Sequence, residues 1–282
     1  MGTVKHATET ATIDWEEHGE GQPIVFLHGW TMNRQVEIDV YEPIFSARAG
    51  WRRIYPDLPG MGLSVAKAIR NQDDVLAAML AFLDHRLAGA PFVLAGTSLG
   101  GYLARAIAAR RREQVRGLLL RVPAIIADTA KRTLPAFEPL VRNESVMAAL
   151  DPAERAAMGP MLVEAKAYVE MARHRFRTLV QPAIDGTAPW ALEMRGDPAR
   201  YGLSFDLAAA EKSFAKPALV IAARQDTTVG YRDAWEILER YPRATFAVVD
   251  RATHGWPTET TDLLAALVDD WLERIEKAEQ SI

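Results

Sequence analysis

The sequence predicts an α/β protein in which a mostly parallel central sheet is covered by helices on both faces. Short apolar runs alternate with stretches whose apolar residues recur at helical spacing. This alternation is typical of parallel strands joined by crossover helices. It holds over residues 1–122 and again over 213–282, whereas residues 123–212 show helical spacing without a clear strand. We therefore expect a core built from the two outer segments and a helical cap, or lid, inserted between them.

The amino-terminal segment supplies most of the expected elements. The alternating residues 10–16 predict an antiparallel edge strand. Buried strands and amphipathic helices then follow one another along the chain. Strands are expected at residues 24–27, 51–55, 92–95 and 115–120, and helices at residues 36–45, 75–83 and 99–110.

The inserted segment contains a strong helix-start signal. In Asp151-Pro152-Ala153-Glu154 an aspartate cap precedes a proline at the first helical position and a glutamate at the third. Gly159-Pro160 interrupts the helical spacing, which resumes over residues 161–179. The alternation of strands and helices returns afterwards, with elements expected at residues 218–222, 231–240 and 245–249 and a final helix from about Pro257.

The composition excludes several classes of protein. The chain has 282 residues, of which 49% are hydrophobic and 25% charged, and its net charge of −4 without a basic stripe argues against nucleic-acid binding. The absence of cysteine excludes disulfides, thiolate metal sites and a cysteine nucleophile. With no apolar signal region and no run of about 18 apolar residues, we expect a soluble cytoplasmic protein that does not bind membranes. The sequence leaves a homodimer open.

The strongest chemical signal is Gly96-Thr97-Ser98-Leu99-Gly100, a G-x-S-x-G pattern between an expected strand and an expected helix. Such a turn holds the serine in a strained conformation and exposes its hydroxyl at the edge of the sheet. The two glycines let strand and helix approach each other, and the helix amino terminus offers free N–H groups. We therefore expect Ser98 to be a nucleophile.

A serine hydroxyl needs a base, and the base needs an orienting group. His254 follows the last expected strand, at the same sheet edge as Ser98. Asp226 follows the strand at 218–222 and reaches that edge too. We therefore expect Ser98, His254 and Asp226 to act together, although His254 as a hydrogen-bonded loop residue is the plainer alternative.

Other candidates for the base and the acid fit less well. Asp250 is too close in sequence to His254, and Asp128 falls in the expected cap. For Asp226 itself, an ion pair with Arg224 or a helix cap is the alternative. His28 ends a strand beside a glycine, where we expect it to support the turn.

An oxyanion formed at Ser98 needs two N–H donors. Leu99, next to the nucleophile, supplies one backbone N–H, and Trp30, in the loop after His28-Gly29, supplies the other. The Trp30 side chain either packs in the core or lines the substrate pocket. Bulky apolar residues of the inserted segment, including Met161 and Trp190, predict an apolar pocket suited to uncharged acyl or aryl groups. Trp30, Trp190 and Trp256 are the expected pocket residues.

These motifs resemble those of the capped α/β-hydrolase superfamily over nearly the whole chain. His28-Gly29 is similar to the superfamily's oxyanion loop, and the segment from Asp57 to Ser64 matches its structural D-x-x-G-x-G-x-S turn. The order Ser98, Asp226, His254 is also that of the superfamily. Within it, the sequence most resembles bacterial carboxylesterases and hydrolases of meta-cleavage products.

The resemblance implies an α/β-hydrolase fold and hydrolysis of small to medium carboxylic esters through an acyl-enzyme, with no metal or organic cofactor. Two alternatives stay open. One is carbon–carbon bond hydrolysis of meta-cleavage-type diketones, although the loop from His28 to Asn33 lacks the longer glycine-rich form of those enzymes. The other is a non-catalytic ligand-binding protein, which would have no need of the complete set of site residues.

Overall fold

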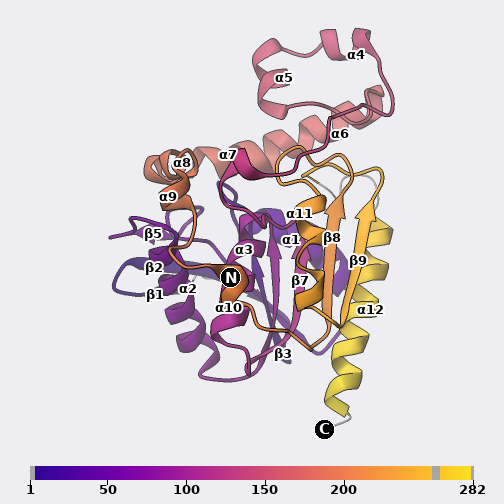
Figure 1. Ribbon diagram of the computed structural model, residues 1–282. Coiled ribbons are helices and arrows are strands. Elements are labelled where there is room, and N and C mark those ends of the chain that lie inside the picture. Colours follow the sequence, from indigo (N-terminus) through magenta and orange to yellow (C-terminus); the bar gives the residue numbers. More distant parts are fainter. Residues whose placement is uncertain (1–3, 256–260, 281–282) are drawn as a thin grey trace.

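The protein is described here as a computed structural model that covers residues 4–255 and 261–280. Within these residues a nine-stranded sheet forms the centre of the molecule, with the order β1-β2-β4-β3-β6-β7-β8-β9 and β5 paired with β2 (Figure 1). The strands are β1 (Val4–Ala7), β2 (Ala11–His18), β3 (Gln22–Leu27), β4 (Trp51–Pro56), β5 (Val65–Ala66), β6 (Phe92–Thr97), β7 (Val115–Arg121), β8 (Ala218–Ala223) and β9 (Ala244–Val249).

The sheet is mostly parallel, as predicted. Strands β4, β3, β6, β7, β8 and β9 run parallel, and the pairings of β2 with β1, β4 and β5 are antiparallel. The prediction that residues 10–16 lie at the edge is wrong, because β1 pairs outside β2. The four-residue strand β1 is too short for its alternation to be recognised.

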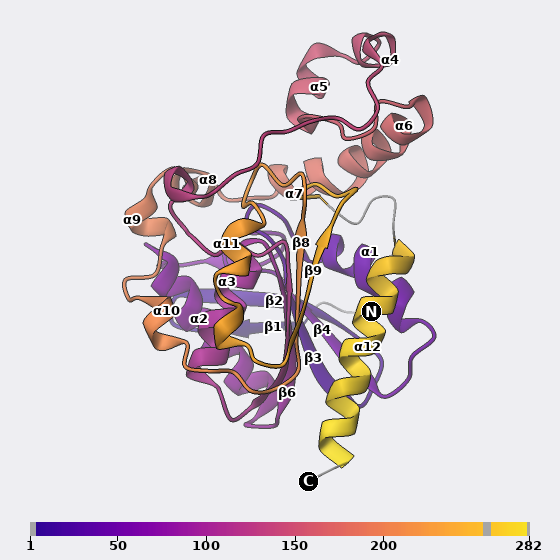
Figure 2. The same ribbon diagram turned by 45° about the vertical axis from the view of Figure 1, so that its right-hand side comes forward.

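Helices cover both faces of the sheet, so each strand buries side chains on two sides. In β3, Val25 and Leu27 belong to one hydrophobic cluster, whereas Ile24 and Phe26 belong to another. This division follows from the two-residue period of a strand. Figure 2 shows α2 and α3 on one side of the sheet and α1 and α12 on the other. These helices are α1 (Arg34–Phe45), α2 (Gln72–Leu87), α3 (Leu99–Arg110) and α12 (Thr261–Gln280).

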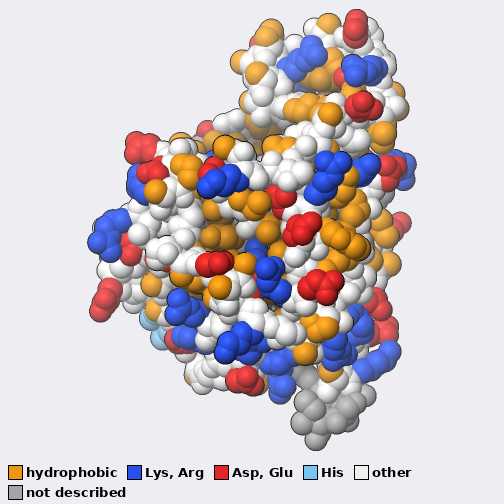
Figure 3. All heavy atoms as spheres, in the orientation of Figure 1, with side chains coloured by type: hydrophobic (Ala, Val, Ile, Leu, Met, Phe, Trp, Pro, Cys, Tyr) orange, Lys and Arg blue, Asp and Glu red, His pale blue; other side chains and the backbone are white. Residues whose placement is uncertain are grey.

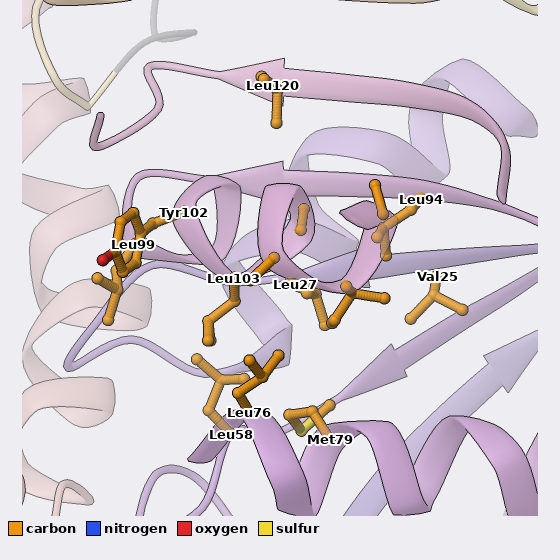
Figure 4. Close-up of a cluster of buried hydrophobic side chains, with 14 of the residues drawn as sticks. Val25, Leu27, Leu58, Leu76, Met79, Leu94, Leu99, Tyr102, Leu103 and Leu120 are labelled. Carbon is orange, nitrogen blue, oxygen red and sulfur yellow. The ribbon is translucent and has the colours of Figure 1, made fainter. Parts of the chain in front are cut away.

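The two faces have separate hydrophobic cores. Figure 4 shows the core under α2 and α3, where Leu27, Leu76 and Leu103 meet. On the opposite face, Phe45 of α1 and Leu272 of α12 are almost completely buried. Burying side chains of this size stabilises the fold by roughly 1.5–3 kcal/mol each. The strands that carry the site are therefore held between two packed layers.

The segment between β7 and β8 is largely helical, as expected. Asp151 accepts N–H groups from Ala153 and Glu154, and the helix it caps ends at Met158, before Gly159. The helices are α4 (Glu144–Ala148), α5 (Pro152–Met158), α6 (Lys166–Arg175), a π-helical turn (Phe176–Val180), α7 (Gln181–Asp185), α8 (Pro189–Arg195), α9 (Pro198–Tyr201) and α10 (Leu207–Ala210).

Two expected boundaries differ in the structure. Helical structure resumes at Lys166 rather than at residue 161, because Val163 bridges to Val141 before α6 begins. The helix expected over 231–240 is split into α11 (Arg232–Trp235) and a 3-10 turn (Leu238–Arg240). The start of the final helix at Pro257 lies outside the described residues.

The first half of the inserted segment projects beyond the carboxyl ends of the strands, whereas α10 lies against α3. Figure 1 shows α4, α5 and α6 standing above the tips of β8 and β9. Hydrophobic and basic side chains are mixed where this lobe joins the body (Figure 3). Across residues 4–255 and 261–280, no helix combines the length and the apolarity that crossing a bilayer requires.

Candidate active site

Ser98 occupies the turn between β6 and α3. Its backbone angles are φ 55° and ψ −120°, a region that non-glycine residues rarely adopt. Two backbone hydrogen bonds hold the turn: the Ser98 N–H donates to the Arg121 carbonyl at 3.0 Å, and the Ser98 carbonyl accepts from the Ala124 N–H at 2.9 Å. The neighbouring strand β7 therefore helps to fix the conformation of Ser98.

The glycines on either side of Ser98 are required by close backbone contacts. A Cβ atom at Gly96 would lie 2.3 Å from the carbonyl oxygen of Gly100. A Cβ atom at Gly100 would lie 2.2 Å from the carbonyl oxygen of Leu27. Strand and helix meet here at a distance that no side chain permits, as the sequence predicted.

The structure brings Ser98, His254 and Asp226 together from three segments of the chain. Nε2 of His254 lies 2.9 Å from Oγ of Ser98, and Nδ1 of His254 lies 2.8 Å from Oδ2 of Asp226. Because a carboxylate can only accept, Nδ1 donates to Asp226 and leaves Nε2 free to accept the serine proton. Asp226 is fully buried, and the His254 side chain is 28% exposed.

The surroundings of Asp226 favour its ionised form. Its Oδ1 accepts the N–H groups of Thr228 at 2.8 Å and Val229 at 2.9 Å. Burial by itself raises the pKa of Asp226, but the His254 charge, the hydrogen bond from His254 and the two N–H groups together lower that pKa below its usual value. A buried anion is therefore directed at the imidazole.

The contacts of Arg224, Asp128 and Asp226 bear on the alternatives for the acid. Arg224 does not pair with Asp226 but stacks on the Tyr231 ring at 4.6 Å. Asp128 caps a short 3-10 turn by accepting the Ala130 N–H at 3.1 Å. Asp226 does cap its own turn through Oδ1, but Oδ2 is left for His254.

The backbone N–H groups of Trp30 and Leu99 lie beside the serine. A Cβ atom added at Gly29 would lie 3.3 Å from the Ser98 Cβ, so the loop that contains Trp30 passes next to Ser98. Leu99 is the first residue of α3, whose N–H has no acceptor within the helix. Within the part of the chain that the structure describes, neither N–H donates to a protein acceptor.

His28 and Asp57 support the loops around the site. Nε2 of His28 accepts the Leu58 N–H at 2.9 Å, and Nδ1 donates to the Gly29 carbonyl at 2.8 Å. Complete burial lowers the pKa of His28, so its ring stays neutral. Asp57 is buried and accepts the N–H groups of Arg34 and Leu63, both at 2.8 Å. Both residues are structural, as the sequence predicted.

A cavity of about 240 Å³ opens at Ser98 and His254. Trp30 lines this cavity, and its indole N–H donates to the Ala191 carbonyl of α8 at 2.8 Å. The expected apolar pocket for uncharged groups is wrong in one respect, because basic side chains line the same cavity. The lining arginines are Arg121, Arg132, Arg175 and Arg195.

Two of the expected cap residues lie elsewhere. Trp190 packs edge-on against Trp30 with ring centroids 6.2 Å apart, and it covers Gly60, so it stands behind Trp30 rather than in the cavity wall. Met161 packs with Met147 inside the projecting lobe. Trp256, which was expected in the pocket together with Trp30 and Trp190, lies outside the described residues.

The arginines were missed from the sequence because no motif marks them. Arg132 and Arg195 are separated by 63 positions and belong to different turns of the inserted segment. In a sequence, each is indistinguishable from an ordinary surface arginine. Among the described residues, no group of three or more His, Asp or Glu side chains is arranged to hold a metal ion.

Comparison with known proteins defines the class. The chain belongs to the alpha/beta hydrolase family, whose sequence profile matches residues 24–267. It is 26% identical over 275 residues to AB hydrolase superfamily protein YisY of Bacillus subtilis, a match covering 95% of this chain and 98% of that protein. The predicted family and fold are therefore confirmed.

Further similarities involve two esterases and another hydrolase of the superfamily. Pimeloyl-(acyl-carrier protein) methyl ester esterase of Shewanella woodyi is 34% identical over 110 residues, which is 39% of each chain. An alpha/beta superfamily hydrolase from Oenococcus oeni shares the fold with a TM-score of 0.82 at 24% identity, covering 97% of this chain and 99% of that chain. A thermophilic esterase from Thermogutta terrifontis has a TM-score of 0.66 at 20% identity, with 98% and 99% covered. The two solved structures confirm the fold, and family membership together with the esterase relative supports a hydrolase.

Proposed function

We propose that the protein hydrolyses small to medium carboxylic esters through an acyl-enzyme, with Ser98, His254 and Asp226 as its catalytic triad. The observation that carries this proposal is the unbroken pair of hydrogen bonds, 2.9 Å from Ser98 to His254 and 2.8 Å from His254 to Asp226. In a serine hydrolase these two contacts activate the hydroxyl and fix the tautomer of the base.

The reaction has two steps, acylation of Ser98 and hydrolysis of the acyl-enzyme. Oγ of Ser98 bonds to the ester carbonyl carbon while its proton passes to Nε2 of His254. The carbon–oxygen bond to the alcohol then breaks, and His254 returns the proton to the leaving oxygen. Water repeats the sequence on the acyl-enzyme and releases the carboxylic acid and free Ser98. Throughout, Asp226 stabilises the positive charge that His254 gains.

The backbone N–H groups of Trp30 and Leu99 stabilise the oxyanion of both tetrahedral intermediates. Their position beside Ser98 and their lack of acceptors among the described residues support this role. The helical segment at residues 123–212 acts as the lid of the site, because Arg132, Ile184 and Tyr201 line the same cavity as Ser98. The lid limits the access of water and the size of the ester.

Labelling with a fluorophosphonate probe and peptide mapping tests the nucleophile. We expect one labelled residue, Ser98, and no labelling or ester hydrolysis in Ser98→Ala. Initial rates on a series of 4-nitrophenyl esters and on a meta-cleavage-type dienone then separate ester from carbon–carbon hydrolysis. Retained activity in Ser98→Ala, or a folded wild-type protein that the probe does not label, contradicts the proposal.

A further inference from the structure

The cavity at Ser98 carries more positive charge than its own residues neutralise. Among the described residues that line it, four are arginines and one, Glu37, is a carboxylate. Glu37 pairs with the buried Arg121 at 3.0 Å, and Arg175 pairs with Asp39 of α1 at 3.1 Å. The side chains of Arg132 and Arg195 form no ion pair with any residue that the structure describes.

Arg132 is held in place by neutral groups. Its Nε donates to the Ile126 carbonyl at 2.8 Å, Nη1 to the Thr228 carbonyl at 2.8 Å and Nη2 to the Ala127 carbonyl at 3.0 Å. A guanidinium has five N–H groups, so two remain for a ligand. The backbone thus orients the charge of Arg132 without neutralising it.

The nearest carboxylates are engaged elsewhere. Asp226 accepts from His254 and from two N–H groups of its own turn. Asp233 accepts the Thr133 N–H at 3.1 Å. Across residues 4–255 and 261–280, neither carboxylate forms an ion pair with Arg132.

Arg195 and Tyr201 add two further donors to the same cavity. Arg195 ends α8, and its side chain is exposed and forms no hydrogen bond or ion pair with any described residue. Tyr201 ends α9, its side chain is buried, and its hydroxyl has no partner in the described part of the chain. Burial raises the pKa of Tyr201 to about 12, so the hydroxyl keeps its proton and can donate.

The charge of Arg195 also acts on Arg132. Burial is the main cause that lowers the pKa of Arg132, and the charge of the exposed Arg195 lowers it further, whereas Tyr201, Asp226 and Asp233 act in the opposite direction. An arginine stays protonated even so. An anion that accepts hydrogen bonds from both guanidinium groups would be bound more strongly than by either one.

We infer that Arg132, Arg195 and Tyr201 form a carboxylate-binding subsite, and that the preferred esters carry a carboxylate on their acyl chain. This inference rests on the proposed function. A carboxylate fits because the three side chains offer two positive charges and a hydroxyl donor, and the cavity of about 240 Å³, below the roughly 300–1,000 Å³ of pockets for drug-sized ligands, limits the acyl chain to a short one. The acyl chain is the favoured part because it stays on Ser98 through both steps, whereas the alcohol leaves after the first.

A matched pair of substrates tests the subsite. We would measure kcat/KM for 4-nitrophenyl hexanoate and for mono-4-nitrophenyl adipate, which have acyl chains of equal carbon number but differ in terminal charge. The wild type should prefer the adipate ester. The adipate-to-hexanoate ratio should fall on the order of ten-fold in Arg195→Gln, as expected for the loss of a charged hydrogen bond, and less in Arg195→Lys, which keeps the charge.

Controls separate this effect from general damage. Arg155 is an exposed arginine of α5 that does not line the cavity, and Arg155→Gln should leave the ratio unchanged. Tyr201→Phe removes one hydroxyl and should lower the ratio by a few-fold. Arg132→Gln is the least suitable variant, because it also removes the hydrogen bonds that three backbone carbonyls accept from Arg132.

Calorimetric titration of the unmodified protein with adipate and with hexanoate tests binding without turnover. The subsite predicts tighter binding of adipate, weakened in Arg195→Gln. Hydrolysis of both esters with no preference, and equal binding of the two acids, overturns the subsite while the proposed hydrolase stands. Arg195-dependent binding of adipate without ester hydrolysis or Ser98 labelling keeps the subsite and rejects the proposed function.

Discussion

Nδ1 of His254 lies 2.8 Å from Oδ2 of Asp226, although the two residues follow different strands. The contact joins the ends of β8 and β9, which are neighbours in the sheet. It determines which ring nitrogen carries the proton, and it thereby links the packing of the sheet to the chemistry proposed for Ser98.

Removing the negative charge of Asp226 tests this link. Asp226→Asn should lower kcat by about 10³- to 10⁴-fold, because an amide favours the wrong tautomer of His254. The measurement is steady-state hydrolysis of a 4-nitrophenyl ester, with circular dichroism to verify folding. Asp128→Asn is the matched control, since Asp128 caps a 3-10 turn and forms no hydrogen bond with His254 in the described part of the chain. If Asp226→Asn keeps nearly full activity while Asp128→Asn is inactive, Asp226 is not the acid of the triad.

The close contact at Gly96 predicts a large loss of stability. In Gly96→Ala the new methyl would lie 2.3 Å from the Gly100 carbonyl oxygen, so β6 and α3 must move apart. We expect a loss of about 1–3 kcal/mol in the free energy of unfolding, typical of overpacking. Urea denaturation measures this loss. Gly196→Ala is the control, because its Cβ would lie 3.5 Å from its nearest neighbour.

Trp190 and Met161 should differ in their effect on substrate choice. Trp190→Ala removes the ring that supports Trp30, so the cavity wall should move and the ranking of esters by acyl-chain length should change. Met161→Ala should leave the ranking unchanged, because Met161 packs inside the projecting lobe. The measurement is kcat/KM across a series of chain lengths. If Met161→Ala changes the ranking and Trp190→Ala does not, the projecting lobe selects the substrate and the cavity wall at Trp30 does not.

Glu17 predicts a pH-dependent contribution to stability. Its carboxylate joins β2 to α2 and β4 by accepting from Arg86 at 2.6 Å and from Arg52 at 3.0 Å. Burial by itself raises the pKa of Glu17, but the bonds from Arg86, Trp15 and Arg52 lower it overall. The stabilisation is therefore present above the ordinary glutamate pKa and is lost as the pH falls through the lowered one.

Glu17→Gln should accordingly cost about 1 kcal/mol at pH 7 and little in strong acid. Urea denaturation at a series of pH values measures the difference from the wild type. Glu20→Gln is the control, because Glu20 is exposed and makes no ion pair with any described residue. A cost for Glu17→Gln that is constant with pH would show that its charge does not stabilise the fold.

The local pattern of the sequence was enough to place most strands and helices and the turn at Ser98. Strand β6 and helix α3 begin and end within two residues of the expected bounds, because continuous apolar runs, helical spacing and the flanking glycines all act locally. The positions of Asp226 and His254 could also be predicted from the sequence. In a parallel sheet, residues that follow strands reach one edge, so chain order alone predicted their meeting.

Only the tertiary structure decided what surrounds that edge. Strand β1 pairs outside β2, Trp190 stands behind Trp30, and Arg132 and Arg195 line one cavity from turns far apart in sequence. None of these contacts has a local signal, because each depends on how the inserted segment and the sheet edge pack together. A regular strand or helix repeats a spacing that the sequence displays, whereas the lining of a cavity depends on side chains brought together across the fold.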